Sequence, residues 1–527
     1  MVHSKRGIAL ATLCVSTVLP TTAQLFAQHE TLGGINDEHV GQVVTTSDGG
    51  YLIVGSTGSF GPSASDQALN AYVIKFNREG DTVWTRIFGG DGSDGLNSVT
   101  VTGDGGYVVA GGYDANAPDI LLARFSSDGT PAWVKRVGTT THQESAGKVI
   151  ALDNDEYLVV GSRVETGGGV DGNMLAVKVS GAGTVIWATE FGSAFRSDAK
   201  DVARLADGGF MIAGTRWQFP NTHFQLARLD SNGTYLWDKT YQSTGSVSGV
   251  AIAPTYNSNF FVAGSNADAL AVWKVDANGD IMWERDYSCG DSFAARDVES
   301  TDSEILVTGS ASDIAGTSVH HLLRLTGFYG DLISQNAYGA SLGFSEAASV
   351  SQGTTTYGIL SVGTLTPDAG TQGAEIHIIQ TFNLQSPCDD WTPIAVEVPP
   401  PALTSTQVMT ALAPPSLQVT DLSTQMAHGG NSTTLCTNVG VEDTPHFVHE
   451  LQVIPNPASD HVDIRFPAGK GISGSVRLID VHGRELLREP VTSDRTTLSV
   501  EGLAPGVYSV LFARGTSFGQ QRFVVQH

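Results

Sequence analysis

The stretch "DGGYVVAGG" at residues 104–112 has two loose copies elsewhere in the chain, "DGGYLIVGS" at 48–56 and "DGGFMIAGT" at 207–215. Glycine pairs beside apolar residues occur both in phosphate-binding loops and in the turns of β-hairpins. A dinucleotide loop or a P-loop requires a helix after the glycines, whereas here a strand-like apolar run follows within one residue. The glycine pairs therefore indicate repeated turns and argue against a nucleotide site.

The apolar run that follows the glycine pair belongs to a longer repeat. Seven such runs end in glycine, and successive glycines are 45 to 56 residues apart, a period typical of propellers and solenoids. The runs are apolar on both faces, as expected for strands between neighbouring sheets. The seven glycines are Gly55, Gly111, Gly161, Gly214, Gly264, Gly309 and Gly363.

Each repeat is predicted to form four strands, with a glycine turn before a fourth strand that carries Trp. We expect the Trp side chains to cover the seams between repeats. The sixth repeat has Gly330 but Ser334 in place of Trp. The five regular pairs are Gly80 with Trp84, Gly129 with Trp133, Gly183 with Trp187, Gly233 with Trp237 and Gly279 with Trp283.

The seventh repeat has a third strand, "EIHIIQTF" (375–382), but no evident fourth strand after it. The segment "QLFAQHETLGG" (24–34) precedes the first repeat and ends in Gly-Gly, as the fourth strand "WTRIFGG" (84–90) does. We therefore expect the N-terminal strand to complete the last blade and close a ring, which removes exposed sheet edges. The predicted fold is all-β, a seven-bladed β-propeller over 24–387.

The first residues read as an export signal. A basic start, "HSKR", precedes the apolar stretch "GIALATLCVSTVL" (7–19), and small residues near position 23 suit a signal peptidase, so 1–23 is predicted to be a signal peptide. No later run is long and apolar enough to predict a transmembrane segment. The net charge of −25 makes this acidic protein a poor partner for nucleic acid.

Residues 388–450 differ in composition from the repeats. They contain the Pro-rich stretches "VPPPALTS" (398–405) and "LAPPSLQV" (412–419), and the sequence leaves open a stiff connector or a small disulfide-fastened β segment. Cys388 and Cys436 flank the Pro-rich part and are a possible disulfide in an oxidising compartment. Cys289 is interpreted as a passive thiol.

From residue 451 the chain is predicted to be β again. "HVDIRF" (461–466) alternates apolar and polar residues, and the strands that follow complete an antiparallel unit of the size of an immunoglobulin-like β-sandwich. Five runs carry this pattern: 461–466, 475–481, 496–500, 506–513 and 521–526.

The motifs "VIPNPASDHVDIRF", "VRLIDVHGRELL" and "LAPGVYSVLF" stand in this order at the end of the chain. Together they resemble the type A C-terminal sorting domain of the type IX secretion system of Bacteroidota, over about 451–527. The resemblance implies handling by the type IX secretion machinery and delivery across the outer membrane, to the cell surface or the medium. The matching residues are Pro455, Asn456, Pro457, Gly483, Gly506 and Tyr508.

The sequence does not predict a catalytic site. Hairpins such as "DSNGTYLW" (230–237) resemble those of quinoprotein propellers and sialidase-type Asp boxes, but the quinoprotein calcium and cofactor residues cannot be placed. The histidines show no paired metal-ligand spacing, and the adjacent His320 and His321 are interpreted as structural. We predict no cofactor and no metal site, with calcium as the one ion to test.

An acid precedes the first strand in six repeats, at Glu38, Asp94, Glu144, Asp198, Asp291 and Glu346. In a closed ring these acids would surround one mouth of the channel, where they could attract cations or simply cap turns. The loops of variable length between second and third strands emerge on the same face. The candidate binding face consists of Phe195, Arg196, Asp198, Trp217, Phe219 and His223.

These features predict an exported, non-catalytic propeller that serves as a binding or adhesion platform for a surface glycan or a protein ligand. The alternative is a secreted propeller enzyme, polysaccharide-directed or quinoprotein-like, whose active-site residues are dispersed over several blades. Three or more convergent acid, His or Arg side chains at one mouth would favour the enzyme.

Overall fold

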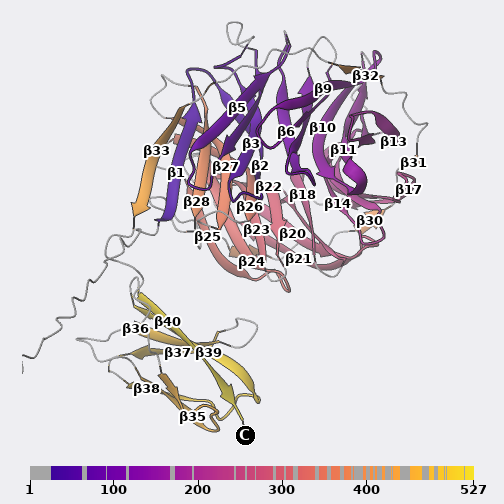
Figure 1. The fold of residues 1–527 in the computed structure, drawn as a ribbon. Helices are drawn as coiled ribbons and strands as arrows, with labels where there is room; N and C mark the ends of the chain where they lie inside the picture. Colours follow the sequence, from indigo (N-terminus) through magenta and orange to yellow (C-terminus); the bar gives the residue numbers. More distant parts are fainter. Residues whose placement is uncertain are drawn as a thin grey trace, which may run out of the picture. The chain divides into compact units, whose positions relative to one another are not determined.

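The computed structural model (Figure 1) describes most of residues 25–381, short segments between 396 and 439, and most of residues 452–526. The predicted signal peptide 1–23 lies outside the described residues, as do Cys289, Asp291, Cys388 and Gly483. Two compact units, Phe26–Asn438 and the C-terminal region from Val439, are described separately below. Within 25–381 the description leaves out 62–67, 91, 114–117, 167–171, 193–194, 243–244, 256–257, 267–268, 289–291, 302–303, 313–317, 339–342, 353–357 and 368–372.

The first unit consists of seven antiparallel sheets, which we number in chain order. Sheet 1 contains β2 (Glu38–Thr45), β3 (Tyr51–Thr57), β4 (Asn70–Phe76) and β5 (Thr82–Phe88). Sheet 2 contains β6 (Gly95–Val101), β7 (Tyr107–Tyr113), β8 (Asp119–Phe125) and β9 (Pro131–Gly138). Sheet 3 contains β10 (His142–Ala151), β11 (Glu156–Glu165), β12 (Gly172–Ser180) and β13 (Val185–Gly192), with a 3-10 turn at Asp153–Asp155. Sheet 4 contains β14 (Ser197–Arg204), β15 (Phe210–Gln218), β16 (Asn221–Leu229) and β17 (Tyr235–Gln242).

The remaining sheets repeat the pattern until the last one. Sheet 5 contains β18 (Val247–Pro254), β19 (Phe260–Asn266), β20 (Ala269–Val275) and β21 (Ile281–Ser288). Sheet 6 contains β22 (Ser292–Ser300), β23 (Glu304–Ser312), β24 (Ser318–Thr326) and β25 (Leu332–Tyr338). Sheet 7 contains β26 (Gly343–Gln352), β27 (Ile359–Pro367), β28 (Glu375–Thr381) and, from the other end of the unit, β1 (Leu25–Gly33).

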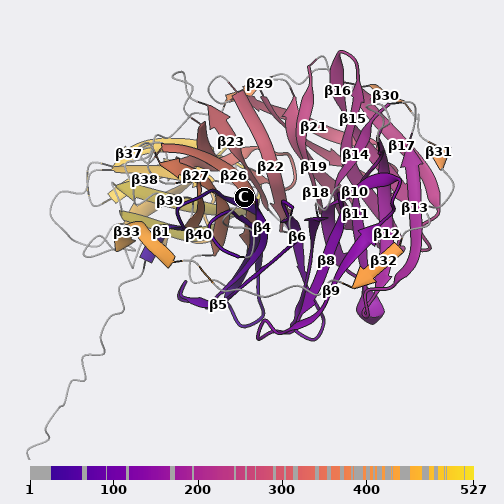
Figure 2. The same cartoon turned by 90° about the horizontal axis from the view of Figure 1, so that it is seen from above.

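The sheets stand side by side in a ring (Figure 2), the arrangement of a β-propeller. Each first strand packs against the first strand of the next sheet, and β26 packs against β2. Every pair of neighbouring sheets shares a buried apolar cluster, because the second strands direct apolar side chains to both faces. Leu52, for example, packs toward sheet 2 and Ile53 toward sheet 7.

The glycine pairs form tight turns between first and second strands, as the sequence predicted. In the turn before β7, Asp104 accepts hydrogen bonds from the Thr102 hydroxyl and from the Gly106 N–H, and Gly105 has φ of 81°. A side chain at Gly106 would collide with the backbone oxygen of Phe125. The first glycine therefore supplies the positive φ, and the second allows the third strand to approach.

The Trp residues lie under the hairpin of the next sheet. A Cβ added at Gly233 of sheet 4 would lie 2.6 Å from the Trp187 ring of sheet 3, and one added at Gly279 would lie 2.8 Å from Trp237. The glycine and Trp of each repeat thus serve two different seams. Sheet 6 needs no Trp at Ser334, because the third and fourth strands of sheet 7 come from opposite ends of the unit and are joined by no hairpin.

The predicted pairing of the N-terminal segment with the last repeat is present. β1 runs antiparallel to β28, with Ala27 opposite Thr381 and Leu32 opposite Ile376. β1 is not the outer strand of sheet 7, however, since β33 (Asn431–Val439) lies beyond it.

The described parts of 388–450 are mainly strands that pair with the sheets of the first unit. They add single strands to the outer edges of the sheets, in reverse order: β29 (Val396–Val398) on β21, β30 (Thr404–Thr406) on β17, β31 (Thr410–Ala411) on β13 and β32 (Gln418–Asp421) on β9. Gly429 then accepts a 2.7 Å hydrogen bond from the Tyr72 hydroxyl of sheet 1. We call residues 396–439 the belt; its strands, orange in Figure 2, lie around the rim. Five sheets therefore contain five strands rather than four.

The C-terminal region is a β unit with its own core. One sheet has the order β34 (Gln452–Ile454), β35 (His461–Arg465), β38 (Arg495–Ser499), and the other has the order β37 (Glu485–Val491), β36 (Gly474–Ile479), β39 (Gly506–Arg514), β40 (Ser517–Val525). Val462, Val476 and Tyr508 are among the residues of the shared core. In the part of the chain that is described, no helix is long and apolar enough to cross a membrane.

Candidate binding site

A β-bulge interrupts the first strand of every sheet at the same place. In sheet 4 the register shifts between Ala199 and Asp201, which leaves Lys200 as the extra residue, and in sheet 6 Arg296 is the extra residue. Such bulges turn a side chain away from the regular pleat. The glycine that recurs within each second strand lies beside the bulge, and a Cβ at Gly214 would collide with the backbone oxygen of Asp198. The register shifts lie at residues 40–42, 96–98, 146–148, 199–201, 248–251, 295–297 and 347–349.

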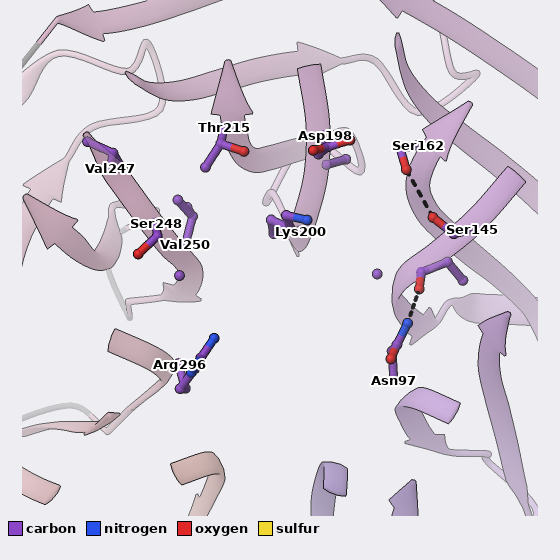
Figure 3. Close-up of a pocket in the computed structure, with 14 residues that line it drawn as sticks. Asn97, Ser145, Ser162, Asp198, Lys200, Thr215, Val247, Ser248, Val250 and Arg296 are labelled. Carbon is purple, nitrogen blue, oxygen red and sulfur yellow. Dashed lines mark hydrogen bonds between the residues drawn. The ribbon is translucent and has the colours of Figure 1, made fainter. Parts of the chain in front are cut away.

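The bulged residues line the centre of the ring. A cavity of about 80 Å³ is bordered by the first strands of all seven sheets. It adjoins a larger cavity of about 520 Å³, which we call the mouth cavity (Figure 3). The mouth cavity lies where the first strands begin and the second strands end. The residues that border it are Asn97, Ser145, Ala146, Gly147, Ser162, Asp198, Ala199, Lys200, Thr215, Val247, Ser248, Gly249, Val250 and Arg296.

Below the mouth cavity, polar side chains join one first strand to the next. Asp201 accepts a 2.9 Å hydrogen bond from the Ile252 N–H of sheet 5, and Asp297 accepts a 3.1 Å bond from the Val350 N–H of sheet 7. Gln42 and Ser98 make the equivalent bonds to the Val99 and Val149 N–H groups. These bonds satisfy backbone groups that the bulged strands leave without strand partners.

Lys148 is the charged neighbour of these acids, with its amine 3.5 Å from the Asp201 carboxylate. Burial opposes its charge, but the Asp201 and Asp297 carboxylates outweigh burial and hold the pKa of Lys148 above its usual value. The acids near the narrow cavity are thus occupied by backbone N–H groups and by this lysine.

Lys200 and Arg296 have a different environment. Both side chains are exposed, and they lie at the border of the open space in Figure 3, one from β14 and the other from β22. The structure gives neither of them a hydrogen bond or an ion pair to any residue it describes. Sheet 5, which stands between sheets 4 and 6, contributes Ser248 to the cavity wall, and sheet 3 contributes a Ser145–Ser162 hydroxyl pair at 2.9 Å. Two cations are therefore available to a ligand in the mouth cavity.

Three of the acids at the starts of the first strands are buried, Glu38, Asp94 and Glu144, and they cap turns, one of the two roles that the sequence left open. Each of three accepts a backbone N–H from four or five residues earlier: Glu38 from Gly34 at 3.0 Å, Asp94 from Gly90 at 2.6 Å and Glu144 from Thr139 at 3.2 Å. Burial raises the pKa of Glu38 and of Glu144, although their hydrogen bonds oppose the rise.

Of the other three acids at the starts of the first strands, the two that the structure describes are only partly buried. Glu346 is half-buried and Asp291 lies outside the described residues. Asp198 borders the mouth cavity, with its side chain 15% exposed and 3.2 Å from the Arg196 guanidinium. Glu38, Asp94 and Glu144 therefore cap turns at the starts of β2, β6 and β10.

The predicted binding face is brought together at one end of sheet 4. Phe195, Trp217 and Phe219 are 37%, 41% and 80% exposed. The Trp217 N–H donates to the backbone oxygen of Arg196 at 2.8 Å, which fixes the end of β15 against the segment before β14. His223 is buried on β16 opposite Arg216, and burial followed by the Arg216 charge lowers its pKa. The aromatic residues are thus accessible, whereas His223 is not.

The sorting-motif residues lie in the C-terminal unit. Pro455, Asn456 and Pro457 are exposed in the turn after β34, and the Asn456 side chain accepts a 2.9 Å hydrogen bond from the Val524 N–H of β40. The Tyr508 hydroxyl donates to the Ala504 backbone oxygen at 2.7 Å, and Gly506 begins β39. The motif therefore ties the start of this unit to its last strand.

The cysteine and metal predictions are not tested by the structure. Cys436 lies on β33, but its side chain, like all of Cys388, is outside the description. Within the described residues no three His, Cys, Asp or Glu side chains are grouped as metal ligands would be. Calcium binding stays a prediction.

Sequence reasoning missed Lys200 and Arg296. Each bulged residue stands 13 to 15 positions before the glycine that recurs within the second strand of its repeat. Alignment of the repeats on those glycines would have placed both cations in the same ring around the centre. A bulge interrupts the alternation of inward and outward side chains at a single position, which is difficult to recognise within one short strand.

Solved structures with similar folds are distant from this chain. The "Dos1 propeller" has 8% identity and a TM-score of 0.40, and it covers 68% of this chain and 96% of its own. A quinohemoprotein alcohol dehydrogenase from Comamonas testosteroni has 9% identity and a TM-score of 0.41, covering 69% and 77%. A mutant of the NanB sialidase from Streptococcus pneumoniae has 9% identity and a TM-score of 0.34, covering 71% and 73%. Such likenesses bear on neither ligand nor reaction, and no curated protein matches the sequence.

The C-terminal unit has a clear relative. Residues 452–526 match the family described as the secretion system C-terminal sorting domain, within the range that the sequence motifs indicated. This is the sorting domain of type IX secretion, and the protein is accordingly secreted across the outer membrane, to the cell surface or the extracellular space.

Proposed function

We propose that this protein is a secreted, non-catalytic binding platform. In this proposal 1–23 is a cleaved signal peptide, the seven sheets are the blades of a closed seven-bladed propeller, and an immunoglobulin-like sandwich at the C-terminus is the export address. The propeller presents a ligand site at the end of sheet 4, where the predicted binding face borders the mouth cavity. The ligand class is a surface glycan.

The observation that carries the proposal is the exposure of Phe195, Trp217 and Phe219. Trp217 is on β15, and Phe195 and Phe219 lie just before β14 and just after β15, the two strands that supply Asp198, Lys200 and Thr215 to the mouth cavity. Large aromatic side chains at the surface cost solvation energy and mark interaction sites when they gather beside a hollow. Aromatic faces next to hydroxyl and amide groups suit the apolar faces and hydroxyl groups of sugar rings.

The carboxylates favour binding over hydrolysis. Glycoside hydrolysis generally uses two carboxyl groups on either side of the scissile bond. Among the residues that border the mouth cavity, Asp198 is the single carboxylate, and it pairs with Arg196 at 3.2 Å. Asp201 and Asp297 accept backbone hydrogen bonds deeper in the ring.

A glycan array and calorimetry on the secreted chain would test the proposal, with and without millimolar calcium. We expect Trp217→Ala to weaken glycan binding about tenfold, since removal of a stacked aromatic costs on the order of 1–2 kcal/mol. Phe328→Ala is the matched control, because Phe328 is also an exposed aromatic residue, at 70%, but lies in a third-to-fourth-strand hairpin at the opposite end of the sheets. Equal binding by both variants and wild type would refute this site.

A further inference from the structure

The charges around the mouth cavity are opposite in sign to those of the protein as a whole. The chain has a net charge of −25, yet the exposed, unpaired charges at this cavity are Lys200 and Arg296. Asp198, the acid nearest to them in the wall, is engaged with Arg196. Like charges that converge on one cavity attract a counter-charge more strongly than the same charges spread over a surface.

Among the described residues, the acids deeper in the ring make no ion pair with Lys200 or Arg296 and have hydrogen-bond partners of their own. Asp201 accepts the Val202 and Ile252 N–H groups and lies 3.5 Å from the Lys148 amine. Asp297 accepts the Val298 N–H at 2.9 Å and the Ser349 hydroxyl at 2.6 Å. Both carboxylates therefore have their own partners, and the two cations above them keep their donors for a ligand.

The geometry points to an acidic saccharide as the ligand, with its oxyanion between Lys200 and Arg296. This inference rests on the proposed function and names its ligand class. An ammonium group and a guanidinium fork together bind carboxylate or sulfate oxygens well. The hydroxyl groups of Ser145, Ser162 and Ser248 line the same cavity and suit the ring hydroxyls of a sugar.

The size and surroundings of the mouth cavity agree with a saccharide rather than a bare ion. A volume of about 520 Å³ is in the range of sites for small organic ligands. Thr215 of the cavity and Trp217 of the aromatic face stand two positions apart on β15 and so lie on the same side of that strand. One ligand can therefore place its acid group in the cavity and a sugar ring on the aromatic residues.

Calorimetry on the full secreted chain tests this with four probes: a galacturonate trisaccharide, a sulfated galactose trisaccharide, a neutral galactose trisaccharide and a polyglutamate peptide. We expect at least one acidic saccharide to bind ten times more tightly than the neutral one, and higher salt to weaken it. Lys200→Gln and Arg296→Gln should each weaken that binding about 10- to 100-fold, the effect of one hydrogen bond to a charged group. The two acidic sugars distinguish carboxylate from sulfate.

Arg78→Gln is the matched control, since it removes the same charge from an exposed hairpin at the opposite end of the sheets and should change binding less than twofold. Equal affinity for acidic and neutral sugars, unchanged in Lys200→Gln, would overturn this inference and leave the proposed function standing. Polyglutamate that binds as tightly as the sugars, with the same loss in both variants, would overturn the saccharide class. Absence of binding to every sugar would contradict both proposals.

Discussion

At the residue scale, Gly233 of sheet 4 shows what the glycine–Trp repeat does. Its φ is 82°, and its Cα faces the Trp187 ring of sheet 3. The Gly233 backbone oxygen also accepts a 2.6 Å hydrogen bond from the Thr189 hydroxyl of sheet 3. Gly233 thus forms the hairpin turn of sheet 4 and also contacts sheet 3. This explains why glycine and Trp recur together, although the Trp of each repeat packs under the glycine of the next repeat.

We expect Gly233→Ala to destabilise the propeller by about 1–3 kcal/mol. The positive φ is unfavourable for alanine, and the new Cβ would lie 2.6 Å from Trp187. Gly103→Ala is the control, because a Cβ at Gly103 meets no atom within 4 Å and its φ is not in the left-handed region. The measurement is the urea midpoint followed by Trp fluorescence. Identical midpoints for the two variants would show that the seam does not depend on this contact.

Some single residues of the fold and of the binding site could be predicted from the sequence, and others could not. The turn glycines, the seam Trp residues and the exposed Trp217 and Phe219 were predictable, because each follows from local turn chemistry or from the repeat. The sequence did not predict that Lys200 and Arg296 are exposed and unpaired within the described part of the chain. Their exposure depends on a bulge, and their lack of ion pairs depends on the partners that acids on other strands have. The same dependence made Glu38 a buried cap instead of a charge facing the channel.

At the scale of elements, the closing strand β1 brings a histidine into the core. His29 on β1 lies with its ring centroid 5.3 Å from those of His377 on β28 and Tyr338 on β25, and His320 on β24 lies 6.0 Å from His377. All three histidines are fully buried. Burial lowers the pKa of His29 to about 4 and that of His320 to about 3, and it lowers the pKa of His377 well below the usual value.

These shifts predict acid sensitivity of ring closure. The unfolded chain binds protons at these histidines below about pH 6.5 and the folded chain does not, so stability is full above pH 6.5 and falls as pH drops toward 4. Because its pKa falls from 6.5 to about 4 on folding, His29 alone accounts for about 3 kcal/mol of this loss.

We expect His29→Gln to flatten the pH dependence of the urea midpoint between pH 7 and 4. His461→Gln should follow wild type, since the His461 side chain is 48% exposed in the C-terminal unit. A His29→Gln curve parallel to wild type would contradict this account. The sequence predicted that β1 pairs with β28 but not that His29, His320 and His377 meet, because β24 contributes from another sheet.

At the scale of the whole molecule, the belt was the least predictable part of the fold. Its Pro-rich segments lack the alternation that marks a strand, and its first four strands, β29 to β32, are only two to four residues long. Such segments become strands because the outer edges of the sheets offer unpaired backbone groups. The sequence of the belt has no local pattern that predicts this pairing. Propeller sheets, by contrast, could be predicted from their own apolar runs and turns.

The belt should protect the outer edges of the sheets from self-association. β29, β30, β31 and β32 pair with β21, β17, β13 and β9, which would otherwise present open edges to solvent. We expect replacement of 396–421 by a Gly/Ser segment of equal length to lower the melting midpoint by about 3–4 °C, as the loss of about 2–3 kcal/mol would in a unit of this size, and to produce oligomers in light scattering. A chain that ends at residue 451 is the control, because it keeps the belt and loses only the C-terminal β unit, which has its own core. If the replaced chain remained monomeric and melted with that control, the edges would be protected by the sheets themselves and the belt would serve only as the path to the sorting domain.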